Sequence, residues 1–170
     1  MKNVRVWFKK AGSAKYISHL DLTRCMSRAL KLSKLPVWYT EGFNPRVYMT
    51  FAMPLSLGVS GERECMDIRL TGETAFPEVV RRLNENLPQD IRAFAAAEPE
   101  MKFDAVEFAE YEMILEMADS ALLVQKLEGL LNRDSVTVLK HGKKGDKEFD
   151  IKPHFSQMQM EQAGPCVLKL

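Results

Sequence analysis

The order of strand-like and helix-like segments in the first hundred residues is the feature that most constrains the fold of this chain. Alternation of apolar and polar residues indicates strands, and apolar residues recurring every three or four positions indicate helices. Strands are expected over residues 4–10, 37–40, 47–52, 64–70 and 91–94. Helices are expected over residues 18–35 and 74–87. This order predicts an α+β fold, a ferredoxin-like split βαβ sheet with its helices on one face.

The ends of these helices carry recognisable signals. Ser18 and Asp21 have the spacing of a capping box, which opens the first helix, and Pro36 stops that helix one residue after Leu35. Thr74 is the expected cap of the second helix.

The second half repeats part of the pattern. Strands are expected over residues 110–117, 135–139, 149–151 and 167–168, and Asp119 or Ser120 caps a helix between the first two. The sheet is therefore predicted to be duplicated, with a domain over residues 1–100 and a second over 107–170. The sequence stops on an apolar strand, which we interpret either as a truncation or as a place where another chain completes the sheet.

Composition indicates a cytoplasmic protein. There is no apolar run of about 18 residues to span a membrane, and the alternating N-terminus does not resemble a secretory signal. Cys25, Cys65 and Cys166 are too widely spaced for a zinc or iron–sulfur pattern and are expected to be small hydrophobic residues. We expect neither a metal nor a cofactor.

Charge is strongly segregated along the chain. Residues 1–60 carry ten bases and two acids, residues 61–135 eight bases and seventeen acids, and residues 136–170 six bases and four acids. The net charges of these segments are therefore +8, −9 and +2. Such asymmetry indicates either a polyanionic partner or two oppositely charged parts that face each other in the fold.

Within the basic segment, the first helix carries the main candidates. Arg24, Arg28 and Lys31 follow one another at helical spacing and form a basic stripe. Phosphate binding at the helix start would use Ser18, although the capping box by itself fully explains Ser18 and Asp21. His19 is required by no cap, so it is a candidate either for a structural role or for acid–base catalysis.

The turn over residues 41–46 is the second candidate region. Gly42 and the Asn44-Pro45 pair are sufficient for a turn, but Phe43 at its tip and the flanking Glu41 and Arg46 are not needed for one. A Phe beside an Arg can stack on a base and hold its phosphate. The alternative is that Phe43 folds into the core and Glu41 pairs with Arg46 on the surface.

Four strings in fixed order resemble the bacterial radical-SAM-linked domain family, a group of unknown function. They are SHLDLTR, LPVWYTEGFNPR, PLSLGV and ECMDIRL, all within residues 16–70. The resemblance implies an accessory domain, fused to or encoded beside a radical S-adenosylmethionine enzyme, often among genes for RNA processing and ribosomal proteins. Because this chain lacks the cluster-binding CxxxCxxC motif, it is not itself the radical enzyme. Members tend to be longer at the C-terminus.

The sequence therefore leads to three hypotheses. The first is a non-catalytic module that recruits an RNA or ribosomal substrate for a radical SAM protein. Its binding residues would be Ser18, His19, Asp21, Arg24, Arg28, Lys31, Glu41, Phe43, Asn44 and Arg46. The second is an RNA-processing or RNA-modifying enzyme that uses His19. The third is a protein-docking module that uses the apolar loop of residues 54–59.

Overall fold

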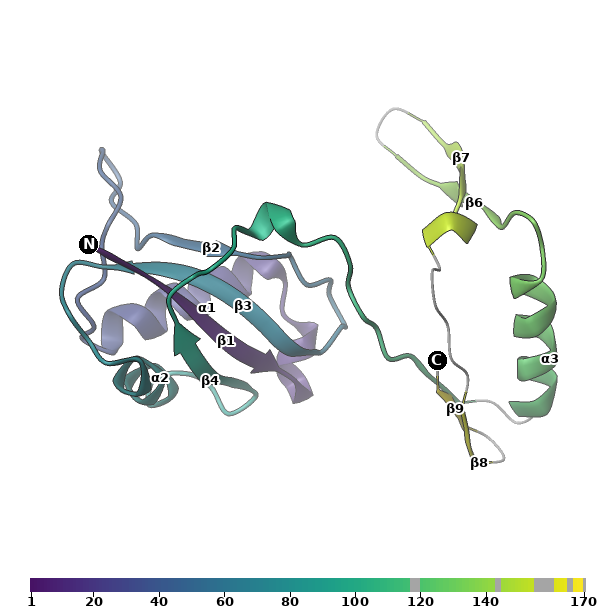
Figure 1. Cartoon of the computed structure of the whole chain (residues 1–170), viewed down its shortest axis with the longest axis horizontal. Coiled ribbons are helices and arrows are strands. Elements are labelled where there is room, and N and C mark those ends of the chain that lie inside the picture. Colours follow the sequence, from purple (N-terminus) through teal and green to yellow (C-terminus); the bar gives the residue numbers. More distant parts are fainter. Residues whose placement is uncertain (117–119, 143–144, 155–160, 165–166, 170) are drawn as a thin grey trace. The chain divides into compact units, whose positions relative to one another are not determined.

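Residues 1–107 and 108–170 form two units in the computed structural model of the chain (Figure 1). The structure describes residues 1–116, 120–142, 145–154, 161–164 and 167–169. None of the helices in these ranges is long and apolar enough to cross a membrane.

The N-terminal unit is a four-stranded antiparallel sheet with two helices. Its strands are β1 (Lys2–Lys10), β2 (Met49–Phe51), β3 (Gly61–Leu70) and β4 (Ile91–Ala97). They lie in the order β2-β3-β1-β4. Helix α1 (His19–Leu32) connects β1 to β2, and α2 (Phe76–Asn84) connects β3 to β4. The predicted α+β class is confirmed.

The core of this unit lies between the helices and one face of the sheet. Alternate residues of the central strand β1, Val4, Val6 and Phe8, are buried, as period-two alternation requires. Both helices contribute to the same cluster, for example through Met26 of α1 and Leu83 of α2, so both cover this face. Because Phe8 is 1 % exposed, we expect Phe8→Ala to cost about 3–5 kcal/mol of stability.

The other face of the sheet carries polar residues in ordered pairs. The Arg5 guanidinium donates to both carboxylate oxygens of Asp67, at 2.7 and 2.9 Å. The Phe103 ring, in the short 3-10 helix η2 (Phe103–Ala105), lies 4.2 Å from the same guanidinium. This segment therefore covers part of the face that has no α-helix.

Helix α1 begins where the sequence predicts and ends earlier. Ser18 is the cap, and its Oγ accepts a hydrogen bond from the Asp21 backbone N–H at 3.1 Å. The helix stops at Leu32 rather than at Leu35, so the expected end was wrong by three residues. The Ser33 hydroxyl donates to the Leu30 carbonyl, and Lys34 takes a left-handed φ of 55°, which turns the chain before Pro36 acts.

The expected cap of α2 was also wrong. Ala75, not Thr74, occupies the cap position and makes no side-chain hydrogen bond there. Pro77, a proline in the first turn, favours the start of this helix instead. Its fixed φ suits that turn, and the N–H that proline lacks would have had no intrahelical partner at this position.

The strands before β3 are shorter than expected. Over residues 37–40 the structure has only isolated bridges, Val37 to Leu70 and Tyr39 to Val47, and β2 is limited to three residues. The chain leaves the sheet after Val37, makes the turn over residues 41–46 and returns as β2.

Lys10, the last residue of β1, lies on the core side and is fully buried. Its Nζ has no hydrogen-bond partner among the described residues. Its cross-strand partner is Gly61, and the Glu64 side chain lies over this glycine, since a Cβ there would come 2.5 Å from Glu64 Cγ. Burial lowers the pKa of Lys10 and raises that of Glu64.

The C-terminal unit does not confirm a second ferredoxin-like copy. Its described elements are β5 (Ile114–Glu116), α3 (Ser120–Leu131), β6 (Thr137–Lys140), β7 (Lys147–Asp150), β8 (Glu161–Gly164) and β9 (Val167–Lys169). The strands form two antiparallel sheets, β5-β9-β8 and the hairpin β6-β7, rather than one. Strand β8 was not expected. Asp119, one of the two predicted caps of this helix, lies outside the described residues.

Candidate functional site

A groove of about 850 Å³ lies between α1 and the segment that leads into β2. The helix contributes one wall, made by Leu20, Thr23, Arg24, Ser27, Arg28, Lys31 and Leu32. The opposite wall is made by Thr40, Arg46, Val47, Tyr48 and Met49. The groove therefore contains all four basic residues of the expected RNA-binding set, Arg24, Arg28, Lys31 and Arg46.

The amphipathic pattern of α1 positions these bases. Leu22, Met26 and Leu30 are directed into the core, whereas Arg24, Arg28 and Lys31, which are themselves three or four positions apart, share an outer side of the helix. Arg24, Arg28 and Lys31 are exposed on that side. The predicted basic stripe is thus one wall of a concave surface.

The charges in the groove are incompletely neutralised by the protein. Arg24 pairs with Asp21 at 3.2 Å, and both side chains are exposed, so this pair contributes little to stability. The side chains of Arg28, Lys31 and Arg46 form no ion pair with any residue that the structure describes. These three cations are available to an anionic ligand.

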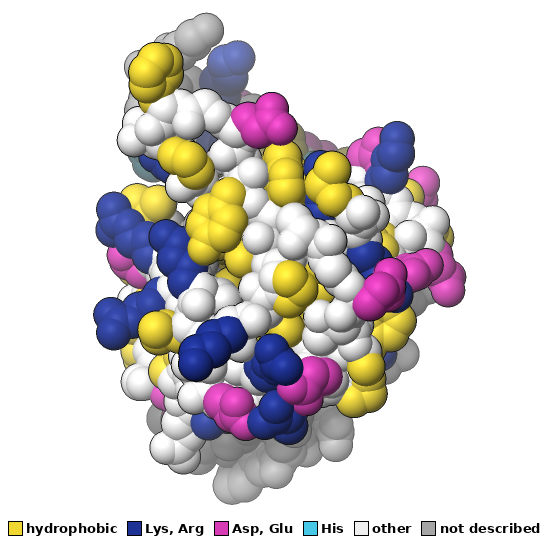
Figure 2. Space-filling model, turned by 90° about the vertical axis from the view of Figure 1, so that its left-hand side faces the viewer, with side chains coloured by type: hydrophobic (Ala, Val, Ile, Leu, Met, Phe, Trp, Pro, Cys, Tyr) yellow, Lys and Arg dark blue, Asp and Glu magenta, His cyan; other side chains and the backbone are white. Residues whose placement is uncertain are grey.

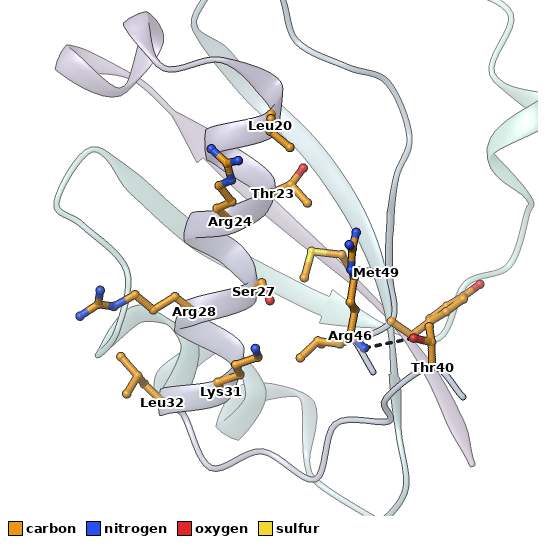
Figure 3. Close-up of a pocket in the computed structure, with 12 residues that line it drawn as sticks. Leu20, Thr23, Arg24, Ser27, Arg28, Lys31, Leu32, Thr40, Arg46 and Met49 are labelled. Atoms are coloured by element: carbon orange, nitrogen blue, oxygen red, sulfur yellow. Dashed lines mark hydrogen bonds between the residues drawn. The ribbon is translucent and has the colours of Figure 1, made fainter. Parts of the chain in front are cut away.

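The side chains of the groove point in different directions (Figure 3). Thr23, Ser27 and Lys31 project from α1 towards the segment that carries Arg46, and Arg28 projects away from it. Backbone N–H of Arg46 donates to Thr40 Oγ1 at 3.1 Å, which fixes the start of this wall.

Arg69 packs against the ring of Tyr48, an aromatic residue of the second wall. The Arg69 guanidinium of β3 lies 4.6 Å from the Tyr48 ring and 4.9 Å from the Trp38 ring. The two rings meet edge to face with centroids 5.6 Å apart. Aromatic and cation–π contacts of this kind hold side chains in one orientation, so Tyr48 is a rigid part of the groove.

The start of α1 is explained by capping. The Ser18 hydroxyl donates to Asp21 Oδ2 at 2.7 Å, and this bond, with help from Arg24, lowers the pKa of Asp21. Both side chains are occupied with each other and with the helix backbone. Neither lines the groove.

His19 is not part of the groove. Its ring packs edge-on against Phe51 of β2, with centroids 5.0 Å apart. Its Nδ1 is buried and has no hydrogen-bond partner among the described residues. The structure therefore does not bring His19 together with the four bases.

The turn over residues 41–46 is fully exposed at its tip. Phe43 is 107 % exposed, so it does not fold into the core, and it does not line the groove. Glu41 and Asn44 are exposed as well, and no ion pair joins Glu41 to Arg46 within this described segment. Gly42 has a φ of 121°, a conformation that favours glycine.

Several groove residues were missed at the sequence level. Thr23 and Ser27 precede Lys31 at intervals of four, so helical spacing alone could have placed them on its face. Tyr48 and Met49 had no such signal, because their place depends on how the chain returns after the turn.

Hydrophobic and basic side chains share the surface of the N-terminal unit. Figure 2 shows this unit from its left-hand side in Figure 1, with Lys and Arg side chains most numerous along the left margin and the lower part of the view and exposed hydrophobic side chains among them. Leu20 and Leu32, which line the groove, are 59 % and 53 % exposed. The surface therefore offers apolar contacts together with positive charge.

The cysteines that the structure describes are not activated. Cys25 and Cys65 are half-buried, and burial raises the pKa of both thiols. Among the described residues there is no cluster of three His, Cys, Asp or Glu side chains arranged to hold a metal ion.

Comparison with known proteins identifies a family but not an activity. The model of a family described as "Uncharacterized protein conserved in bacteria" (DUF2344) matches residues 3–170, which is nearly the whole chain. No curated protein matches the sequence.

Proposed function

We propose that this chain, which belongs to the DUF2344 family, is a non-catalytic adaptor that binds RNA. The observation that carries the proposal is the groove, in which Arg28, Lys31 and Arg46 have no acidic partner among the described residues. Groups of exposed cations along a concave surface are typical of proteins that track a phosphate backbone.

The exposed turn supports the same proposal. Phe43 at the tip of residues 41–46 is completely exposed, so both faces of its ring are accessible to a ligand. Stacking on a nucleobase would cover the ring. We therefore propose that Phe43 stacks on a base of an RNA whose phosphates lie along the groove.

A catalytic function through His19 has less support. A general acid or base must be within hydrogen-bond reach of the reacting group, and His19 does not line the groove that would hold the RNA. One of its ring nitrogens is also buried.

The resemblance to radical-SAM-linked domains extends the proposal to a partner. The adaptor would deliver its RNA, or a ribosomal substrate containing RNA, to a separate radical SAM protein. The apolar loop of residues 54–59 is the proposed docking point, since Leu57 is 67 % exposed there. If Leu57→Glu leaves capture of the radical SAM protein encoded beside this chain unchanged, the loop is not the docking point.

RNA binding itself is tested by fluorescence anisotropy with a labelled RNA of mixed sequence over a series of KCl concentrations. We expect affinity to fall with salt, with a log–log slope of about −2 to −3 for three or four phosphate contacts. Polyglutamate of equal charge is the control and should bind at least about tenfold more weakly, because it offers no base to stack. Absence of binding at the lowest salt concentration, or equal binding of polyglutamate, contradicts the proposal.

A further inference from the structure

We infer that the groove selects single-stranded RNA and excludes duplex RNA, an inference that rests on the proposed function. It concerns the shape and lining of the groove rather than its charge. Charge alone attracts single strands and duplexes alike, since both carry phosphates.

The first observation is the size of the groove. Its volume of about 850 Å³ lies within the range of sites for small organic ligands. Such a space admits a few unstacked nucleotides. A helical duplex is a rigid rod with its bases inside, so it can touch the rim of the groove but cannot enter.

The second observation is the chemistry between the two walls. Thr23 and Ser27 project into the gap between α1 and the segment that carries Arg46 (Figure 3). The Thr23 hydroxyl donates to the His19 carbonyl at 2.9 Å and keeps its acceptor sites. The Ser27 hydroxyl has no hydrogen-bond partner within the described residues, so it can donate or accept. Neutral hydroxyls are suited to the Watson–Crick edge of a base, whose donors and acceptors are free only in single strands.

The third observation is the apolar part of the lining. Leu20 and Leu32 lie exposed near the two ends of the helix wall, and Met49 projects towards the helix from the other wall. A phosphate backbone gains nothing from such side chains, whereas the flat face of a base does. Lys31 and Arg46 would then hold the phosphates on either side of an inserted base.

The experiment compares a labelled single-stranded RNA with a duplex of equal total phosphate number, at one salt concentration. The wild-type chain is expected to bind the single strand at least about tenfold more tightly, the effect of one stacked base. Ser27→Phe places a bulky ring between the two walls without changing any charge and should abolish this preference while duplex binding stays unchanged. Ser56→Phe, a substitution of equal size on an exposed loop, is the matched control and should keep the preference.

Circular dichroism and thermal unfolding show whether Ser27→Phe is folded. If it is not, Arg46→Ala replaces it, because Arg46 lies outside every helix and its side chain has no ion-pair partner among the described residues. This variant should reduce single-strand binding more than duplex binding. Equal affinity of the wild type for both RNAs overturns the inference and leaves the proposed function intact, whereas failure to bind either RNA ends both.

Discussion

Helices α1 and α2 cover the same face of one sheet, yet their outer surfaces differ. The two arginines of α2 are neutralised on their own helix: Arg81 pairs with Glu78 at 2.7 Å and also with Glu85, and Arg82 pairs with Glu78 at 2.5 Å. On α1 only Arg24 has an acidic partner among the described residues. Both helices pack against the same face of the sheet and contribute to the same core. The fold therefore does not require the unpaired cations of α1. Under the proposed function, an RNA ligand neutralises them.

The largest effect on RNA binding is expected when two cations are removed from α1 and, for comparison, two from α2. Arg28→Ala with Lys31→Ala should weaken RNA binding about tenfold or more, because two charge-assisted contacts are lost. The log–log salt slope should become shallower by about 1.4. The matched pair on α2, Arg81→Ala with Arg82→Ala, removes the same charge and should leave affinity within about twofold. Similar losses for both pairs, measured by anisotropy titration, would show that only net charge matters.

Ser27→Glu makes α1 resemble α2. The new carboxylate lies three residues after Arg24 and four before Lys31, so it can pair with both. We expect RNA affinity to fall by about fivefold, because the pair competes with phosphate. Stability should rise by about 0.3–0.5 kcal/mol in urea denaturation. Ser27→Gln is the uncharged control, and a loss of affinity as large as that of Ser27→Glu would assign the effect to shape.

The helix starts provide a second difference to test. Ser18 caps α1 through its side chain, whereas Ala75 of α2 cannot. Ser18→Ala should therefore cost about 1 kcal/mol, and Ala75→Asp should add up to about 1 kcal/mol by supplying the missing acceptor. Urea denaturation measures both. If Ser18→Ala has no effect, the cap that the sequence predicts is not important for stability.

The smallest effect is a pH dependence at Glu78 of α2. Hydrogen bonds from Arg81 and Arg82 lower the pKa of Glu78 to about 2, so the folded state holds this carboxylate ionised. The stabilisation is fully present above the ordinary carboxyl pKa of about 4.3 and is lost as the pH falls towards 2. The stability difference between wild type and Glu78→Gln should therefore shrink between pH 6 and pH 2.5 in thermal unfolding. A difference that stays constant would show that these arginines do not stabilise the ionised form.

The first unit was largely predictable because its signals are local. Strand alternation around Val6, the cap at Ser18 and the stripe from Arg24 to Lys31 each depend on residues within a few positions of one another. Predictions were wrong where a nearby residue competed. Ser33 and Lys34 end α1 before Pro36, and Pro77 replaces the cap expected from Thr74.

The groove itself could be predicted only in part. Its helix wall follows from periodicity, but its second wall depends on the return of the chain after residue 46 and on the stacking of Tyr48 against Arg69. These residues are 21 positions apart, and nothing local to either indicates the contact. His19 and Phe43, two further candidates, do not line the groove: His19 packs on Phe51, and Phe43 lies at the exposed tip of a turn.

The end of β1 places two neighbouring lysines in opposite surroundings. The Lys9 side chain is 46 % exposed and pairs with Glu62 at 2.7 Å, while the ammonium of Lys10 is sealed inside the unit. An amine-reactive label will therefore modify Lys9 in the native protein and reach Lys10 only when the sheet opens. The rate of labelling at Lys10 relative to Lys9, measured in one peptide, therefore reports how often the N-terminal unit opens. Bound RNA should lower this relative rate.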